Sequence, residues 1–311
     1  MLVSVYCLTY NHEKYIRDTL EGFVSQKTDF EYEVFVHDDA STDHTADIIL
    51  EYAQNYPDLI KPILQKENQY SKGVSILRTY IWPKMTGKYI AACEGDDYWC
   101  DPDKLQRQVS FLEEHPDYTA CAHNTMILNL QNGKKRLFIP AQKAGTIPTK
   151  QIIEWKKPPH ISSLVYKRKL REEAFEFTRV VPGMGDYPLT LWLMSKGNIY
   201  YMPEVMSVYR SGVEGSWTQR NGNAAGIADK KIKVLEAFNI KTDYSYSKIV
   251  NCTIEKFRAE YYYSTDINKL IEMGYWKLIK LGYGNMAVAV FLQKHFYGLY
   301  KMISELLYGK R

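Results

Sequence analysis

The sequence has no run of apolar residues long enough to cross a membrane. The longest uncharged stretch in its C-terminal part, residues 281–293, is thirteen residues long, whereas a membrane-spanning helix needs about 20 predominantly apolar residues. Residues 2–9 form a strand-like segment directly after Met1, where a secretory leader would carry a basic region and then an apolar one. We therefore expect neither a signal peptide nor a transmembrane helix.

Cysteine is scarce as well. The five cysteines among 311 residues form no C-x-x-C pair, and several of them lie in apolar runs, as buried thiols do. An odd number of scattered cysteines excludes a scaffold held together by disulfides. It predicts a reducing compartment and therefore a cytoplasmic protein.

Strong net charge is also absent, but the charge is unevenly distributed. The formal net charge is +4, and residues 225–311 contain 14 Lys and Arg against 8 Asp and Glu. Because this part has no basic platform interleaved with aromatics, we expect no nucleic acid partner. Two interpretations stay open: a helix face that packs on the protein or on a second subunit, and a face that lies on an anionic membrane.

Strand-like and helix-like segments alternate through the first half of the chain. Strands are expected at residues 2–9, 32–37, 61–65, 88–93 and 118–128, with helices between them, one of which spans residues 74–85. This alternation with short connections predicts an α/β fold with a mostly parallel sheet covered by helices. Such sheets bind ligands beyond the carboxyl ends of their strands.

The second half has a different pattern. A hairpin turn at Asn132-Gly133 is followed by a helix at residues 189–195, a strand at 199–209 and helices from 228 onward. We predict an α/β domain of residues 1–224, with a nucleotide-binding half of about 1–128 and an acceptor half of about 129–224. A C-terminal helical region, residues 225–311, follows it.

Three carboxylates lie within four residues at Glu94-Gly95-Asp96-Asp97, directly after a buried strand. Carboxylates this close repel one another unless a cation lies among them, and their hard oxygens suit Mg²⁺ or Mn²⁺. The alternative is an acidic turn at the head of a helix, where Asp is favourable without a metal.

A second acidic segment, residues 38–45, follows another strand. Either Ser41 or Asp43 is expected to cap the next helix, while Asp38 and Asp39 are free to accept hydrogen bonds from a nucleobase or ribose. The spacing does not match a calcium loop, which needs alternating acidic positions and a central glycine.

Two further features lie in the second half. Asp186 begins an apolar helix, as either a cap or a general base. Arg210 and Trp217 belong to a segment rich in glycine and aromatic residues, which is either a closing lid or an ordinary surface loop.

Together these motifs resemble the family-2 glycosyltransferases, inverting enzymes of the GT-A fold. The segment Asp38 to Asp43 is similar to the family's D-D-x-S-x-D nucleotide motif, and residues 94–97 are similar to its metal-binding D-x-D-D. Gly185-Asp186 followed by Tyr209-Arg210 is similar to its E-D acceptor-base segment and the strand end after it. The resemblance covers about residues 1–220.

The resemblance implies a role for each motif. The donor would be a nucleotide-diphosphate sugar, most often a uridine one, and Asp186 would be the catalytic base. Asp96 and Asp97 would hold Mn²⁺ or Mg²⁺, with Asp96 also facing the donor. The remaining donor-binding residues would be Thr9, Asn11, Asp38, Asp39, Arg78 and Glu94. His160, Trp99, Arg210 and Trp217 would line the acceptor side or a lid.

The chain departs from the family pattern at two positions, and it lacks one signature. Glu94 replaces the first Asp of D-x-D-D, and Gly185 replaces the Glu of E-D. The Q-x-x-R-W signature of processive synthases is absent from the sequence, which implies one sugar per encounter with a glycan or lipid-linked acceptor. The alternatives are a non-catalytic relative that binds sugar nucleotides, and a nucleotidyltransferase, which would normally show a Gly-rich phosphate loop.

Overall fold

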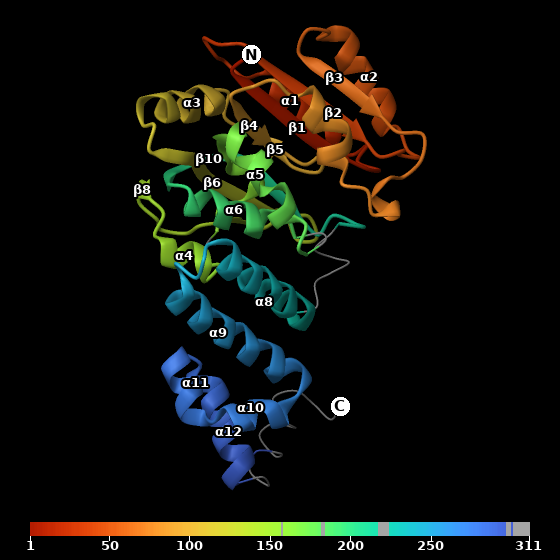
Figure 1. The fold of residues 1–311 in the computed structure, drawn as a ribbon. Helices are drawn as coiled ribbons and strands as arrows, with labels where there is room; N and C mark the ends of the chain where they lie inside the picture. The colour runs from red at the N-terminus through yellow and green to blue at the C-terminus, as the bar shows by residue number, and fades with distance from the viewer. Residues whose placement is uncertain (157, 182–183, 217–223, 297–299, 301–311) are drawn as a thin grey trace. The chain divides into compact units, whose positions relative to one another are not determined.

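The computed structural model describes residues 1–156, 158–181, 184–216, 224–296 and 300 (Figure 1). Among these residues the chain divides into two compact units. The first consists of residues 1–179 and 185–216, and the second contains the remaining residues. Each unit is described by itself below.

The first unit is built on one mixed sheet with the strand order β3-β2-β1-β4-β9-β6-β10-β5. Strands β1, β2, β3 and β4 pair in parallel, as do β6 and β10, whereas β5, β7, β8 and β9 are antiparallel to their neighbours. The strands are β1 (Val3–Thr9), β2 (Tyr32–Asp38), β3 (Ile60–Leu64), β4 (Tyr89–Ala92), β5 (Tyr98–Trp99), β6 (Tyr118–Asn129), β7 (Lys135–Leu137), β8 (Gly145–Thr146), β9 (Val165–Lys167) and β10 (Asn198–Ser211). The predicted mostly parallel α/β sheet is confirmed.

Helices cover the sheet, and this explains why its inner strands are nearly continuous runs of buried residues. Alternate residues of β1, such as Val3 and Val5, pack with α1 (Ile16–Val24), α2 (Thr45–Asn55) and α3 (Lys104–Glu114) in one apolar core. Phe23 of α1 meets the Trp99 ring edge-on in this core, with ring centroids 4.9 Å apart. The other helices of this unit are α4 (Thr149–Ile153), α5 (Arg168–Thr178) and α6 (Asp186–Ser195).

The connections of this unit agree with the sequence in one place and differ in another. Gly133 has a φ of +69°, and β6 and β7 pair on either side of it, so the predicted hairpin is confirmed. The single helix expected at residues 74–85 is instead a π turn, Leu77–Ile81, followed by a 3₁₀ turn, Trp82–Lys84. Pro83 explains the break, because proline lacks an N–H and clashes with the preceding turn of an α-helix.

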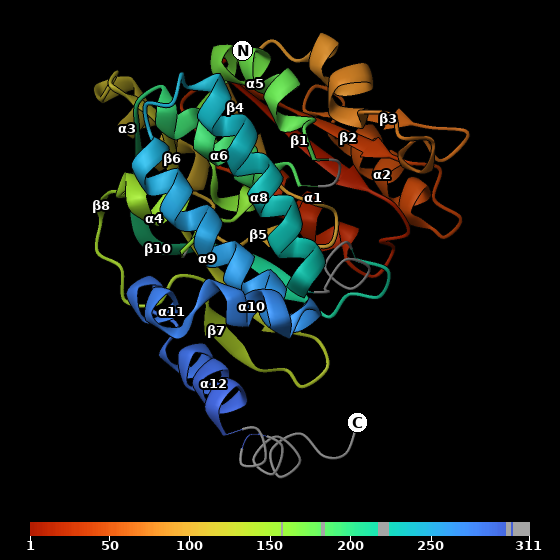
Figure 2. The same ribbon diagram turned by 60° about the horizontal axis from the view of Figure 1, so that its bottom comes forward.

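The second unit is helical. It contains α8 (Ala224–Lys241), α9 (Ser247–Thr265), α10 (Ile267–Met273), α11 (Tyr275–Leu281) and α12 (Gly284–His295). Helices α8 and α9 lie side by side in both views (Figures 1 and 2). A small core at Leu270, Leu278 and Val290 joins the last three helices. Within the described residues, no helix is both long and apolar enough to span a bilayer.

Candidate active site

The carboxyl ends of β1, β2 and β4 meet at one edge of the sheet. Thr9 pairs with Asp38, and the Asp39 N–H donates to the Thr9 carbonyl at 3.0 Å. On the other side of β1, the Gly95 N–H donates to the Leu8 carbonyl at 2.9 Å. The two acidic segments of the sequence are therefore neighbours, each beside the end of β1.

Residues 94–97, which we call the acidic turn, have the chemistry of a cation site. Carboxylate oxygens of Glu94, Asp96 and Asp97 lie within 4.8 Å of one another. Asp97 is fully buried; its Oδ1 accepts from the Arg210 N–H at 2.8 Å, and its Oδ2 has no hydrogen-bond partner among the described residues. A buried carboxylate oxygen without a donor is costly, so this donor set fits a hard divalent cation.

Without a cation the acidic turn is electrostatically strained. Burial raises the pKa of Asp97, with the charge of Asp96 adding to it and the Arg210 N–H opposing it. Desolvation and the charges of Asp96 and Asp186 raise the pKa of Glu94, and the exposure of this side chain to solvent limits the rise. A bound cation would reverse both shifts, because it favours the charged carboxylates.

Gly95 lets the acidic turn approach β1. A Cβ at this position would lie 2.7 Å from the Thr9 Cβ and 2.9 Å from the His12 Nδ1, closer than atoms can pack. Both neighbours hold a buried polar atom without a hydrogen-bond partner among the described residues, Thr9 Oγ1 and His12 Nδ1. His12 was not predicted from the sequence. Its position three residues after Thr9, in the polar segment that follows β1, could have indicated it.

Arg210 supports the acidic turn. It lies near the end of β10 and is only 7% exposed. Its Nη1 donates to the Asp96 carbonyl at 2.9 Å, it pairs with Asp18, and its guanidinium lies 4.5 Å from the centroid of the Tyr98 ring. The same residue thus binds the turn through both its backbone and its side chain. Trp217, the other predicted lid residue, lies outside the described residues.

The side chains of Asp38 and Asp39 organise the loops beyond β2. Asp38 accepts from the N–H and the hydroxyl of Ser41. Asp39 is buried, and its two oxygens accept from the N–H groups of Gln69 at 2.8 Å and Tyr70 at 3.0 Å. These contacts fix both carboxylates at the sheet edge.

Asn11 and Asp43 lie in the loops that follow β1 and β2. The Asn11 Oδ1 accepts from the Thr42 N–H at 2.8 Å. The N-cap residue of α2 is His44 rather than Ser41 or Asp43 as expected, and the Asp43 carboxylate beside it accepts from the Thr45 N–H at 3.0 Å. Asn11 joins the β1 and β2 loops, which keeps it at the site's edge.

Asp186 begins α6, and its charge reaches the acidic turn. Its carboxylate accepts no hydrogen bond among the described residues, which disfavours the capping alternative. The side chain is exposed on one side, yet surrounding protein atoms raise its pKa to about 6, and the charge of Arg171 opposes the rise. Arg171, on α5, was not anticipated; it is 8% exposed, and its Nε and Nη1 lack partners among the described residues.

His160 faces the acidic turn from the 3₁₀ turn Ile161–Ser163. Its Nε2 lies 3.8 Å from the Asp97 Oδ2, and its Nδ1 accepts from the Ser162 N–H at 3.3 Å. The ring centroid lies 4.8 Å from that of Tyr209. Burial lowers the pKa of His160 to about 4, so the ring is neutral near pH 7. The ring Nδ1 also lies 2.7 Å from the Ser162 Oγ, and which of these two atoms donates depends on the tautomer.

Trp99 and Arg78 are less closely linked to the acidic turn. Trp99 is 3% exposed, and its Nε1–H donates to the Ser162 carbonyl at 3.0 Å, so it anchors the core. The Arg78 guanidinium lies 2.5 Å from the Glu176 carboxylate and 5.7 Å from the centroid of the Phe175 ring. Its predicted contact with the donor stays a prediction.

Known proteins resemble both the sequence and the fold. The family model described as glycosyl transferase family 2 matches residues 4–171. An uncharacterized protein of Mycobacterium tuberculosis, Rv1520, is 35% identical over 224 residues, which are 69% of this chain and 60% of the relative. The chain thus spans about 60% of the length of that relative.

Two other relatives carry more specific names. The putative glycosyltransferase EpsE of Bacillus subtilis is 35% identical over 41% of this chain and 44% of its own length. The Escherichia coli protein WfaP, named a UDP-Glc:alpha-D-GlcNAc-diphosphoundecaprenol beta-1,3-glucosyltransferase, is 36% identical over 36% of this chain and 41% of its own length. Both alignments are shorter than the first unit.

Solved structures share the fold at low sequence identity. The crystal structure of S. aureus TarS 1–349 in complex with UDP-GlcNAc has a TM-score of 0.63 and 19% identity, covering 94% of this chain and 81% of that one. The mannosyltransferase PcManGT from Pyrobaculum calidifontis, in complex with GDP-Man and Mn²⁺, has a TM-score of 0.54 and 16% identity, covering 95% and 87%. These likenesses support the GT-A fold alone.

Proposed function

Because the chain belongs to glycosyl transferase family 2, we propose that it moves one sugar from a nucleotide-diphosphate sugar, a uridine one, to a hydroxyl of a glycan or lipid-linked acceptor. The reaction is metal-dependent and inverting, and it serves the synthesis of a cell-surface polysaccharide. The observation that carries the proposal is the acidic turn, whose three carboxylates cluster within 4.8 Å, while the charge of Asp186 acts on one of them, Glu94.

Asp96 and Asp97 would hold Mn²⁺ or Mg²⁺, with Glu94 as a third oxygen donor. When bound, the cation would neutralise the negative charge that develops on the leaving diphosphate. The chain itself contributes the fixed position of Asp97, whose Oδ1 is held by the Arg210 N–H while its Oδ2 stays available. The base and ribose of the donor would lie at Thr9, Asn11, Asp38 and Asp39, with Arg78 as a further donor contact.

Asp186 would take the proton from the acceptor hydroxyl as that oxygen attacks the anomeric carbon. Attack from the face opposite the leaving diphosphate forms one bond while the other breaks, which inverts the anomeric centre. His160 and Tyr209 would line the acceptor side. His160 places its Nε2 3.8 Å from the Asp97 Oδ2.

The donor is tested by thermal unfolding of the full chain with a panel of UDP-, GDP- and dTDP-sugars, with and without Mn²⁺. We expect a rise in melting temperature that needs both the nucleotide sugar and the metal. Release of UDP in the presence of acceptors separates the enzyme from a non-catalytic relative. Release of pyrophosphate from a nucleoside triphosphate and a sugar phosphate would instead favour a nucleotidyltransferase.

The rate of transfer should depend on pH through Asp186. A general base works only when deprotonated, and desolvation by the surrounding protein atoms places the pKa of Asp186 at about 6. We therefore expect kcat/KM to be level above about pH 7 and to fall about tenfold per pH unit below pH 6. Initial rates between pH 5 and 8 at saturating metal measure this limb. A profile that stays level down to pH 5 contradicts the assignment.

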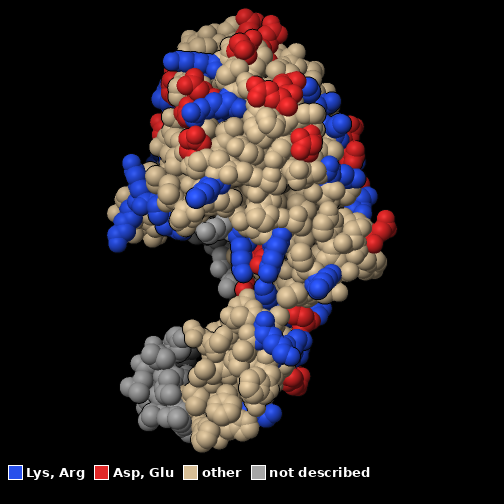
Figure 3. Space-filling view, turned by 90° about the vertical axis from the view of Figure 1, so that its left-hand side faces the viewer, with Lys and Arg blue, Asp and Glu red and all other residues tan. Residues whose placement is uncertain are grey.

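We also propose that the protein works in the cytoplasm, with its last helices on the inner face of the membrane. Trp276 and Ile279 of α11 and Val288 and Phe291 of α12 are exposed apolar side chains. Figure 3 shows a face of this part that is mostly uncharged, with basic and acidic side chains at its edge. Leu299, Met302 and Leu306, which follow Val288 and Phe291 at helical spacing in the sequence, lie outside the described residues.

Co-sedimentation with anionic vesicles tests this placement. The full chain should bind vesicles containing phosphatidylglycerol. The double variant Trp276→Asp/Phe291→Asp should bind them at least about tenfold more weakly, because a charge replaces each exposed apolar group that would enter the membrane. The matched control is Tyr56→Asp, an exposed aromatic position of the first unit. Equal binding by all three proteins, or a dimer that the double variant dissociates, would favour the alternative of protein packing.

A further inference from the structure

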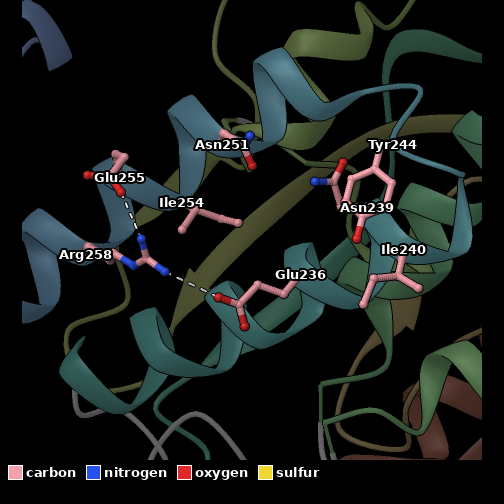
Figure 4. A pocket seen from close by; sticks show the side chains of 8 residues that line it. All are labelled: Glu236, Asn239, Ile240, Tyr244, Asn251, Ile254, Glu255 and Arg258. Atoms are coloured by element: carbon pink, nitrogen blue, oxygen red, sulfur yellow. Dashed lines mark hydrogen bonds and ion pairs between the residues drawn. The ribbon is translucent and has the colours of Figure 1, made fainter.

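The second unit contains a hollow that the reaction described above does not use. It has a volume of about 620 Å³ and lies between α8 and α9 (Figure 4). Helix α8 and the connection after it supply Glu236, Asn239, Ile240 and Tyr244, and α9 supplies Asn251, Ile254, Glu255 and Arg258. This volume is within the range of about 300–1,000 Å³ that is usual for small-molecule sites.

Asn239 carries an unsatisfied polar group into this hollow. The residue is 6% exposed, and its Oδ1 has no hydrogen-bond partner among the described residues. A buried acceptor without a donor is costly, and it is usually satisfied by water or by a ligand. The Oδ1 is enclosed by protein atoms, so a ligand hydroxyl or N–H in the hollow reaches it when the Asn239 amide turns.

Tyr244 is held at one end of the hollow by two consecutive residues with positive φ angles. The Asp243 N–H donates to the Ile240 carbonyl at 3.1 Å and the Tyr244 N–H to the Asn239 carbonyl at 2.8 Å, the pattern of a Schellman helix end. Asp243 and Tyr244 have φ angles of +48° and +59°, and the second is unfavourable for a bulky side chain. Even so, the Tyr244 ring stays 60% exposed beside Asn239 (Figure 4).

The opposite end of the hollow has fixed, planar polar groups with no net charge. Arg258 donates to Glu255 at 2.9 Å and to Glu236 at 3.4 Å, as Figure 4 shows, and Lys277 pairs with Glu255. Two carboxylates thus face two cations. This balance favours neither an anionic nor a cationic ligand, while the remaining lone pairs and N–H groups suit neighbouring hydroxyls.

We propose that this hollow binds an uncharged sugar residue. Sugars combine an apolar C–H face, which fits the exposed Tyr244 ring and Ile254, with hydroxyls that fit Asn239, Asn251 and the Arg258 pairs. The inference rests on the proposed function, because the bound sugar is taken to belong to the glycan on which the enzyme acts. It adds a carbohydrate site carried by the helical unit itself.

Saturation-transfer NMR on the full chain tests the proposal. The probes are the methyl glycosides of glucose, galactose, N-acetylglucosamine and rhamnose, together with maltose and cellobiose, each at millimolar concentration. At least one probe should receive saturation in the wild type. Tyr244→Ala and Asn251→Ala should each weaken its binding at least fivefold, while Tyr263→Ala, an exposed tyrosine of α9 outside the hollow, should leave it unchanged.

Binding of UDP with Mn²⁺ is measured on the same samples, so that two failures are distinguishable. If UDP binds but no sugar does, or if Tyr244→Ala binds the sugar as the wild type does, the carbohydrate site is wrong and the proposed function stands. If UDP with Mn²⁺ fails to bind, the proposed function fails. Because Tyr244 and Asn251 are both exposed, their truncation leaves the fold intact, which thermal unfolding of each variant verifies.

Discussion

Replacement of Asp186 by Asn is expected to lower the rate of sugar transfer by about 10²–10⁴-fold, the usual contribution of a general base. Asn has the same shape but takes no proton at neutral pH, so the acceptor hydroxyl keeps its proton during attack. Binding of the nucleotide sugar should change little, because the donor is assigned to the ends of β1, β2 and β4. The change should therefore appear in kcat rather than in the affinity for the donor.

Initial rates with saturating donor and metal, compared with calorimetric binding of UDP, measure the Asp186→Asn effect. Asp58→Asn, an exposed carboxylate elsewhere in the same unit, is the matched control and should retain wild-type rates. Asp186→Asn with near-normal turnover contradicts the base assignment. Loss of UDP binding in Asp186→Asn would contradict the claim that Asp186 serves the acceptor and not the donor.

Asp97→Asn is expected to abolish metal-dependent donor binding and to lower the transfer rate at least about 100-fold. Loss of a group that supports a metal ligand costs about 10–100-fold, and loss of the ligand itself should cost more. The Asn Oδ1 can still accept from the Arg210 N–H, so the turn should keep its geometry. Since burial and the charge of Asp96 disfavour ionised Asp97, the neutral variant should unfold at no lower temperature than the metal-free wild type.

Thermal unfolding with and without Mn²⁺ and UDP separates these effects. The wild type should gain stability with both additions, and Asp97→Asn should not, while Asp117→Asn, an exposed control, should behave as the wild type does. A variant that still gains the full Mn²⁺-dependent shift contradicts the metal assignment. A large loss of stability without metal would indicate that Asp97 serves the fold rather than a cation.

The sequence predicted the parts of the site that local patterns encode. The strands that end at Thr9, Asp38 and Ala92 are continuous buried runs followed by polar residues, and parallel pairing brings such ends together. The fold class and the family therefore followed from ordered motifs. The assignment of Asp96, Asp97 and Asp186 to their roles still rests on that family pattern and on the experiments above.

Residues recruited by tertiary contacts were beyond local patterns. Arg171 belongs to an unremarkable charged helix, and only the packing of α5 brings its charge to bear on Asp186. Arg210 looked like part of a polar loop, but β10 extends to Ser211 and buries its guanidinium behind the acidic turn. His12 becomes part of the site because Gly95 allows close approach. Each case depends on partners far away in the sequence.

The stereochemistry of transfer tests the central claim most directly. The wild-type chain is incubated with α-linked UDP-sugars, Mn²⁺ and a panel of glycoside acceptors, and ¹H NMR follows the anomeric signals of the first product. The account predicts a β-linked product formed in step with UDP, and both signals should grow at least about 100-fold more slowly with Asp186→Asn. An α-linked product, or the absence of any transfer from donors that the protein binds, would contradict it.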